Sequence, residues 1–146
     1  MQTKQEQPSI VAVYQLYHES DEIYHIYARQ HDLSDTALAI LYSLHGQKTP
    51  YTQRALCDEW HIPPQTLNSI LKGLEKKELV ILTPDPSNRR TKQVSLTEQG
   101  TALAEQVIAP LKEAEERVFN QLSPKEQETL LMLTRKYLGL LREEIN

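Results

Sequence analysis

The amino-acid sequence predicts a mainly α-helical chain with a small β-wing, arranged as a winged helix-turn-helix flanked by N- and C-terminal helices. Three observations predict this fold. Two short helical segments lie within residues 52–77, and a proline-containing break separates them. A hairpin with a basic tip follows over residues 80–97, and long apolar helical stretches flank the whole region. A helix, a tight turn, a second helix and a basic hairpin, in this order, make up the layout of a winged helix-turn-helix.

The two short helices are predicted from their boundaries and their apolar spacing. Thr52 can cap a helix over Gln53–Trp60, the segment 61–63 interrupts it, and Pro64 opens a second helix that runs to about Lys77. One face of the second helix is an apolar stripe with i, i+3, i+4, i+7 spacing, made of Leu67, Ile70, Leu71 and Leu74. The opposite face carries side chains that hydrogen-bond to base edges and phosphates, namely Gln65, Thr66, Asn68, Ser69 and Lys72.

The hairpin is predicted from an apolar triplet, a run of turn formers and an alternating segment. Residues 80–82 are aliphatic, residues 84–88 are five turn-forming residues in a row, and Val94 and Leu96 alternate with polar neighbours. Arg89, Arg90 and Lys92 are expected on or beside the turn, where no core requires them. A protruding cationic hairpin is suited to phosphates or to a groove of a duplex, although a solvated surface hairpin would share this pattern.

Long helices are expected on both sides of this region. Residues 8–30 form an apolar and aromatic stripe, and Ser34 can cap a helix that closes near Gly46. Thr97 is expected to start a helix that Pro110 bends, and Ser123 opens the last helix with a capping box. Terminal helices this apolar cannot all be buried on a compact lobe of about 60 residues. They predict a homodimer, and a monomeric helical bundle is the alternative.

Composition favours a DNA-binding protein of one domain over the other classes. The chain has 146 residues and a net charge of −4, yet residues 61–92 hold six Lys/Arg against three acids, a local net charge of +3. No apolar run is long enough to span a membrane, and Met1–Gln7 lacks the apolar core of a signal peptide. The single cysteine allows no disulfide within the chain. We therefore expect a cytoplasmic protein.

Residues 33–100 resemble the DNA-binding lobe of the MarR family of bacterial transcription regulators. The resemblance rests on a wing signature that reads Asn88-Arg89-Arg90, then Leu96-Thr97 and Gly100, and on Leu74–Lys77 leading into Leu79-Val80. The order of elements agrees along nearly the whole chain. The resemblance implies a single domain over residues 1–146 that comprises the 33–100 lobe and dimerisation helices at 8–30 and 101–146.

Four positions depart from the family pattern. The wing aspartate is Asn88, and many relatives carry an arginine in the recognition helix where this chain has Ser69. His61 and Glu78 replace glycines that are common at two turns, and a left-handed conformation costs a non-glycine residue about 1 kcal/mol. The first two departures leave open a rival class, a protein-interaction or ligand-binding module that has lost DNA binding.

The function expected from these features is that of a transcriptional regulator. As a homodimer it would bind a palindromic operator in double-stranded DNA and act as a repressor that a small ligand releases. The helix over residues 64–77 would enter the major groove, and Arg89 and Arg90 the minor groove. The expected DNA-binding residues are Gln65, Thr66, Asn68, Ser69, Lys72, Arg89, Arg90 and Lys92. No phosphate-binding loop, nucleophile elbow or zinc-enzyme motif occurs in the sequence, so we expect no enzyme activity and no cofactor.

Three further groups of residues invite a sensing role. In the resembled family, small aromatic or anionic effectors bind where the first helices meet the winged lobe. That junction would place an effector pocket around Tyr14, Tyr17, His18, Tyr42 and His45, although packing of the tyrosines in a dimer seam is the favoured alternative. His18, Glu22, His25 and His45 suggest a metal, but they form no compact ligand signature, and no metal site is assigned. Cys57, beside Asp58 and Glu59, is expected to be a structural cysteine rather than a thiol sensor.

Overall fold

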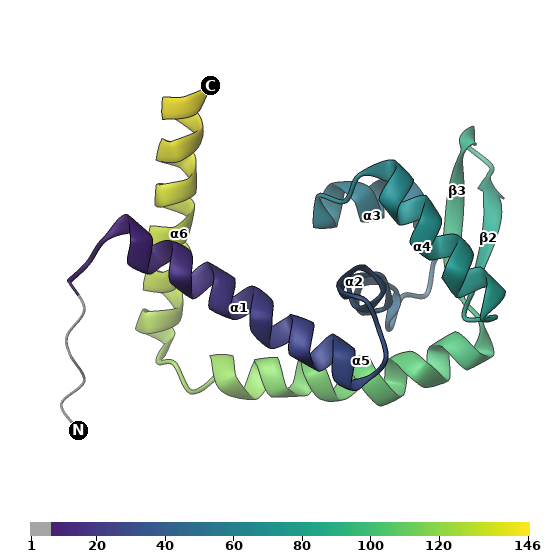
Figure 1. The fold of residues 1–146 in the computed structure, drawn as a ribbon, viewed down its shortest axis with the longest axis horizontal. Coiled ribbons are helices and arrows are strands. Elements are labelled where there is room, and N and C mark those ends of the chain that lie inside the picture. The colour runs from purple at the N-terminus through teal and green to yellow at the C-terminus, as the bar shows by residue number, and fades with distance from the viewer. Residues whose placement is uncertain (1–6) are drawn as a thin grey trace. The chain divides into compact units, whose positions relative to one another are not determined.

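The computed structural model describes residues 7–146 and confirms a mainly helical chain with a small antiparallel sheet (Figure 1). Residues 1–6, part of the segment in which we expect no signal peptide, lie outside the described residues. The chain divides into two compact units, one ending at Ile108 and one spanning Ala109–Asn146. In chain order the elements are α1 (Ile10–Gln30), α2 (Asp35–Leu44), β1 (Tyr51–Thr52), α3 (Gln53–Trp60), α4 (Pro64–Lys76), β2 (Val80–Asp85), β3 (Asn88–Leu96), α5 (Glu98–Phe119) and α6 (Pro124–Ile145).

The helices begin where side chains can satisfy their first free N–H groups. The hydroxyl oxygens of Ser34 and Thr52 accept hydrogen bonds from the N–H groups three residues later, at 3.1 and 3.0 Å. Ser123 and Glu126 form the predicted capping box at the start of α6. Ser9 caps α1 in the same manner, a cap that the sequence analysis did not assign. The predicted starts of α2, α3 and α6 are therefore confirmed, whereas α1 begins at Ile10, two residues later than expected.

The small sheet has the order β1–β3–β2, with both pairs of strands antiparallel. The expected turn was too long: β2 continues through Pro84 to Asp85, and β3 already begins at Asn88. Pro84 is tolerated because β2 is an edge strand and a missing N–H costs little there. Arg89, Arg90 and Lys92 consequently lie in the first half of β3, beside the turn. Strand β1 was not predicted, because two residues carry no readable alternation.

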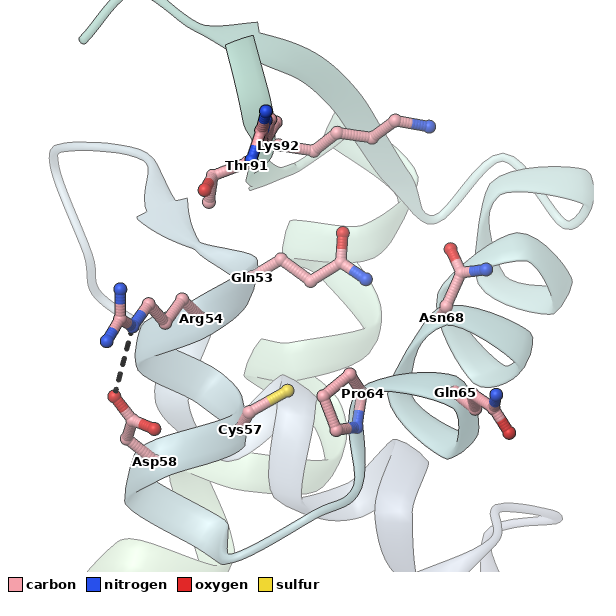
Figure 2. Close-up of a pocket in the computed structure, with 10 residues that line it drawn as sticks. Gln53, Arg54, Cys57, Asp58, Pro64, Gln65, Asn68, Thr91 and Lys92 are labelled. Carbon is pink, nitrogen blue, oxygen red and sulfur yellow. Dashed lines mark ion pairs between the residues drawn. The ribbon is translucent and has the colours of Figure 1, made fainter. Parts of the chain in front are cut away.

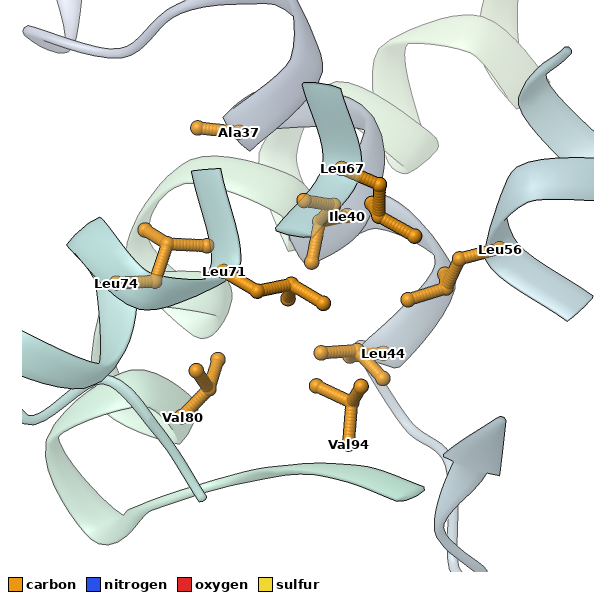
Figure 3. Close-up of a cluster of buried hydrophobic side chains, with 9 residues drawn as sticks. All are labelled: Ala37, Ile40, Leu44, Leu56, Leu67, Leu71, Leu74, Val80 and Val94. Atoms are coloured by element: carbon orange, nitrogen blue, oxygen red, sulfur yellow. The ribbon is translucent and has the colours of Figure 1, made fainter. Parts of the chain in front are cut away.

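The core of the winged unit collects the apolar faces of three helices and two strands (Figure 3). Three members of the predicted stripe on α4 are buried in it, while Ile70 packs against its edge. Because one side of α4 is fixed in this core, the opposite side must face outward. The buried cluster consists of Ala37, Ile40, Leu44, Leu56, Leu67, Leu71, Leu74, Val80 and Val94.

A network of hydrogen bonds fastens the end of α4 to the end of the wing. Glu78 has the expected left-handed conformation (φ 59°), as does His61 (φ 51°). The hydroxyl of Thr97 donates to the Glu78 carbonyl at 2.6 Å, and the N–H of Gly100 donates to the Thr97 hydroxyl at 3.0 Å. A Cβ on Gly100 would lie 1.9 Å from the carbonyl oxygen of Leu79. The threonine and the glycine of the wing signature therefore serve this junction, which sets the wing relative to α4.

The terminal helices leave much apolar surface exposed. In the second unit, α6 has no buried residue, and leucines along it are about half exposed. Exposed apolar side chains also run along α1, among them Leu16 and Ile23. Pro110 lies inside α5, which is helical on both sides of it, and the bend expected there stays a prediction. Among the described residues, no helix is long and apolar enough to cross a membrane.

Candidate nucleic-acid interface

The outer face of α4 presents the polar side chains expected to read DNA. Pro64 occupies the first turn, where its missing N–H has no helical acceptor to serve. Gln65, Thr66, Ser69 and Lys72 are exposed, and the neighbouring Asn68 is half-buried. The helix thus presents amides, hydroxyls and one cation on a surface that its own core does not need.

The wing tip is held by side-chain hydrogen bonds to the backbone. The buried carboxylate of Asp85 accepts from the N–H and the hydroxyl of Ser87, at 3.0 and 2.8 Å. The amide oxygen of Asn88 accepts from the N–H of Arg90 at 3.1 Å. Asn88 therefore orders the backbone at Arg90, and this hydrogen bond needs no charge on its side chain. Arg89 and Arg90 are exposed on the strand that leaves this tip.

A cleft of about 620 Å³ lies between α3, the start of α4 and the wing strand β3 (Figure 2). Four of the expected DNA-binding residues line it: Gln65 and Asn68 from α4, and Arg90 and Lys92 from β3. The other four, Thr66, Ser69, Lys72 and Arg89, are exposed but lie outside its lining. The remaining lining residues are Gln53, Arg54, Cys57, Asp58, Pro64 and Thr91.

The sequence analysis missed Gln53 and Arg54, which come from the first turn of α3. The Thr52 cap could have located them, because it fixes where the first turn of α3 begins. The sequence does not show which side of α3 faces the wing, because that depends on tertiary packing. Figure 2 shows the Gln53 amide directed across the cleft toward Asn68. It also shows Arg54 beside Asp58, and these two side chains form an ion pair of 3.9 Å.

Cys57 lies in the lining of this cleft and is half-buried. Burial, and secondarily the charge of Asp58, raise the pKa of its thiol above the usual value. A raised pKa disfavours the thiolate, which is the nucleophilic form. The structural role expected for Cys57 stays a prediction.

A hydrogen-bonded group behind the cleft fixes α3 against α2 and β1. Glu59 accepts from the hydroxyls of Ser43, at 2.8 Å, and Tyr51. The indole N–H of Trp60 donates to the Ser43 hydroxyl at 2.7 Å. The hydrogen bond to Glu59, then burial and the carboxylate charge, raise the pKa of the Tyr51 phenol. Tyr51 also pairs with Val94 of β3, so this group ties α3 to the base of the wing.

The five residues expected around an effector pocket lie in three places. Tyr14, Tyr17 and His18 are exposed along α1, and Tyr42 packs edge-on against Trp60 with ring centroids 5.9 Å apart. His45 lines a pocket of about 410 Å³ at the base of the wing, where its Nε2 lies 2.9 Å from a carboxylate oxygen of Glu105. The described lining of that pocket includes none of the other four. The effector pocket therefore stays a prediction.

Two of the three histidines considered for a metal, His25 and His45, have carboxylate partners. His25 Nδ1 lies 2.8 Å from Asp35 Oδ1, which ties α1 to the start of α2. His45 has the partner on α5 described above. Within residues 7–146 no group of three His, Cys, Asp or Glu side chains is placed to hold a metal ion.

The element order, the sheet and the packed α4 together define a winged helix-turn-helix protein. Solved structures share this fold: NMB1585, a MarR family regulator from Neisseria meningitidis, matches with a TM-score of 0.79 and 22% identity, over 95% of this chain and 97% of its own. Staphylococcus aureus MepR in its complex with DNA matches with a TM-score of 0.69 and 26% identity, over 93% of this chain and 99% of its own.

Sequence comparison identifies the family. The family model described as MarR family matches residues 31–91. The HTH-type transcriptional regulator SarZ of Staphylococcus aureus (strain USA300) is 32% identical over 102 residues, which cover 70% of this chain and 66% of SarZ. The chain belongs to the MarR family of winged-helix transcriptional regulators. The resemblance noted in the sequence is thus confirmed, and the expectation of a regulator rather than an enzyme agrees with these relatives.

Proposed function

We propose that this protein is a sequence-specific DNA-binding regulator that represses transcription as a homodimer at a palindromic operator and is released by a small ligand. The observation that carries the proposal is the cleft that places Gln65 and Asn68 of α4 beside Arg90 and Lys92 of the wing. Recognition amides and protruding cations are adjacent here on one surface. The net charge of +3 over residues 61–92, in a chain of net charge −4, favours DNA at this surface. The structural relative MepR has been solved in complex with DNA, which supports DNA as the partner of this chain.

In the proposed complex, α4 enters the major groove and the wing enters the neighbouring minor groove. Gln65, Thr66, Asn68 and Ser69 then face base edges, and Lys72 faces the backbone. Arg89 and Arg90 extend from β3 toward the minor groove, where a narrow A·T-rich segment attracts arginine, and Lys92 faces a phosphate.

The exposed apolar surfaces of the terminal helices support the proposed dimer. Leu16 on α1 is 65% exposed, and Val118 on α5 is 64% exposed. Side chains of this kind, repeated along α1, α5 and α6, form more apolar surface than a monomer usually leaves in water. A two-fold dimer would place two copies of α4 about 34 Å apart, one turn of DNA, which is why a palindromic site is expected.

The proposed ligand is a small aromatic or anionic molecule bound where α1 and α2 meet the winged lobe. Tyr14 and Tyr17 offer exposed rings for such a site, with His18, Tyr42 and His45 as its other candidate members. The α1 members are exposed in the single chain, so the proposed dimer would have to cover them for the site to enclose a ligand. Binding there could alter the spacing of the two α4 helices, and with it the fit to the operator.

Selection of bound sequences from a random duplex pool tests the proposal. We expect enrichment of a two-fold symmetric site. Affinity for that site should fall steeply with salt, with a slope of about −0.9 in log K against log[salt] for each phosphate that the basic side chains neutralise. The cations concerned occur twice in a dimer: Lys72, Lys76, Lys77, Arg89, Arg90 and Lys92.

Absence of duplex binding at low salt would reject the regulator and favour the rival, an interaction or ligand-binding module that kept the fold. The replacements Ser69 and Asn88 motivate that rival. Asn88, however, still orders the backbone at Arg90, so a working wing does not require an aspartate at this position.

The two parts of the interface, α4 and the wing, should respond differently when a side chain is replaced by alanine. Arg90→Ala should weaken binding most at sites with A·T-rich flanks, because a narrow minor groove concentrates negative potential. Asn68→Ala should instead relax sequence preference, by about 1–3 kcal/mol of discrimination if its amide reads an adenine edge. Both variants can be titrated against the selected site and a scrambled duplex. If Arg90→Ala binds both duplexes as tightly as the unmodified protein, the wing is not the minor-groove reader.

A further inference from the structure

We propose that Arg54, on the first turn of α3, binds the DNA backbone between the two grooves, and that the neighbouring carboxylate of Asp58 competes with the phosphate for it. This inference rests on the proposed DNA binding and adds a contact outside α4 and the wing. It also assigns an acidic side chain a negative effect on affinity.

The position of the cleft indicates where a DNA strand would pass over the protein. If α4 lies in the major groove and the wing in the adjacent minor groove, the sugar-phosphate strand that separates the grooves runs between α4 and β3. The cleft occupies that position, and Gln65 and Asn68 of α4 and Arg90 and Lys92 of β3 line it. Figure 2 shows Asn68 and Lys92 on these two elements. Its remaining wall is α3, which contributes Gln53, Arg54, Cys57 and Asp58. A strand in the cleft therefore meets α3 as well.

The charges of the α3 residues in the cleft indicate which of them would bind a phosphate. The raised pKa of Cys57 keeps a negative charge off the thiol, and Gln53 is neutral. Arg54 is then the only cation that α3 contributes to the lining, and Asp58 is the only acid in the lining as described. The planar guanidinium of arginine matches the oxygens of a phosphate with two parallel hydrogen bonds. A phosphate that enters the cleft meets attraction from Arg54 and repulsion from Asp58.

The ion pair between Arg54 and Asp58 is weak enough for a DNA phosphate to replace the carboxylate. Its atoms are 3.9 Å apart, and the side chains are 81% and 76% exposed. An exposed pair at that distance contributes little to stability, so its loss on DNA binding costs little. A doubly hydrogen-bonded phosphate in a cleft with two further cations is the stronger partner. Asp58 thus lowers DNA affinity in two ways, by occupying Arg54 and by repelling the strand.

The chain offers a matched control on α5. Arg117 and Glu113 form an ion pair with the same i, i+4 spacing and the same separation of 3.9 Å, and their side chains are 70% and 71% exposed. Neither residue lines the cleft. Changes to this pair reproduce the loss of charge and of a surface ion pair, but not the loss of a cleft contact.

The test titrates full-length variants against the selected duplex over a range of salt concentrations. We expect Arg54→Ala to weaken binding about tenfold and to make the slope less steep by about 1.8, two contacts of 0.9 in a dimer. Arg54→Lys should keep most of the slope, because it keeps the charge. Asp58→Asn should tighten binding several-fold. Arg117→Ala and Glu113→Gln should leave affinity within about twofold of the unmodified protein.

The outcomes separate this inference from the proposed function. If the unmodified protein binds no duplex, the proposed function itself fails. If it binds and Arg54→Ala matches Arg117→Ala in both affinity and slope, Arg54 does not touch the backbone and the inference is overturned. If Asp58→Asn leaves affinity unchanged, the competition is overturned. Circular dichroism of each variant ensures that a loss of binding is not a loss of fold.

Discussion

Replacing Gly100 by alanine is expected to destabilise the protein by about 3 kcal/mol, because the added methyl group has no space. Its Cβ would lie 1.9 Å from the carbonyl oxygen of Leu79 and 2.9 Å from the carbonyl carbon. Both atoms belong to the backbone, so no rotamer change relieves the overlap. That carbonyl also accepts the N–H of Thr97 at 3.1 Å, and a shift of either segment would weaken this bond.

Thermal unfolding measures the effect of Gly100→Ala. For a chain of this size, 3 kcal/mol corresponds to a decrease in Tm of about 10 °C. The control is Gly73→Ala: Gly73 lies exposed within α4, and its added Cβ would meet no atom within 4 Å. That variant should be more stable by up to about 1 kcal/mol, since alanine is the better helix former. Equal Tm values for the two alanine variants would show that the backbone at Leu79 can shift to accept the added methyl group without loss of stability.

Much of the fold could be predicted from the sequence because its signals are local, and Gly100 shows where local signals end. Local signals suffice for the helix starts, since each of Ser34, Thr52 and Ser123 accepts a hydrogen bond within its own first turn. The helical spacing of the apolar residues on α4 likewise predicts that this face is buried. Gly100 is different. The motif marked it as a family feature, whereas its physical role depends on Leu79, a residue 21 positions earlier that only the folded chain brings close.

The candidate site was predictable in part, for the same reason. The exposed face of α4 and the cations of the wing follow from local sequence, and the cleft brings together Asn68 and Arg90 from those two groups. The extent of the turn did not follow, because Pro84 argues against a strand unless β2 is known to lie at the edge of the sheet. Arg54 did not follow either, since its proximity to the wing is set by packing of α3 against β3, with Leu56 and Val94 in one core.

Placing two acidic residues on the apolar face of α6 is expected to abolish the proposed dimer. Leu133 and Leu140 are two helical turns apart on one face, and they are 53% and 57% exposed in the single chain. Fully burying a leucine contributes about 1.5–3 kcal/mol, and each of these side chains is already about half buried in the single chain. Losing two from each chain therefore removes about 3–6 kcal/mol from the dimer. A buried carboxylate without a partner adds a further cost. The variant Leu133→Asp/Leu140→Asp should therefore sediment as a monomer.

The same variant should lose affinity for a two-fold site, because one chain can occupy only one half-site at a time and loses the gain from linked binding. The control is Arg135→Asp/Arg142→Asp, which has the same spacing and a larger change in charge. These exposed arginines lie about 200° around the helix from the leucines, at about 100° per residue. The control should stay dimeric. A leucine variant that remains a dimer would exclude this face of α6 from the interface, and the apolar side chains of α1 and α5 would then have to supply the contact alone.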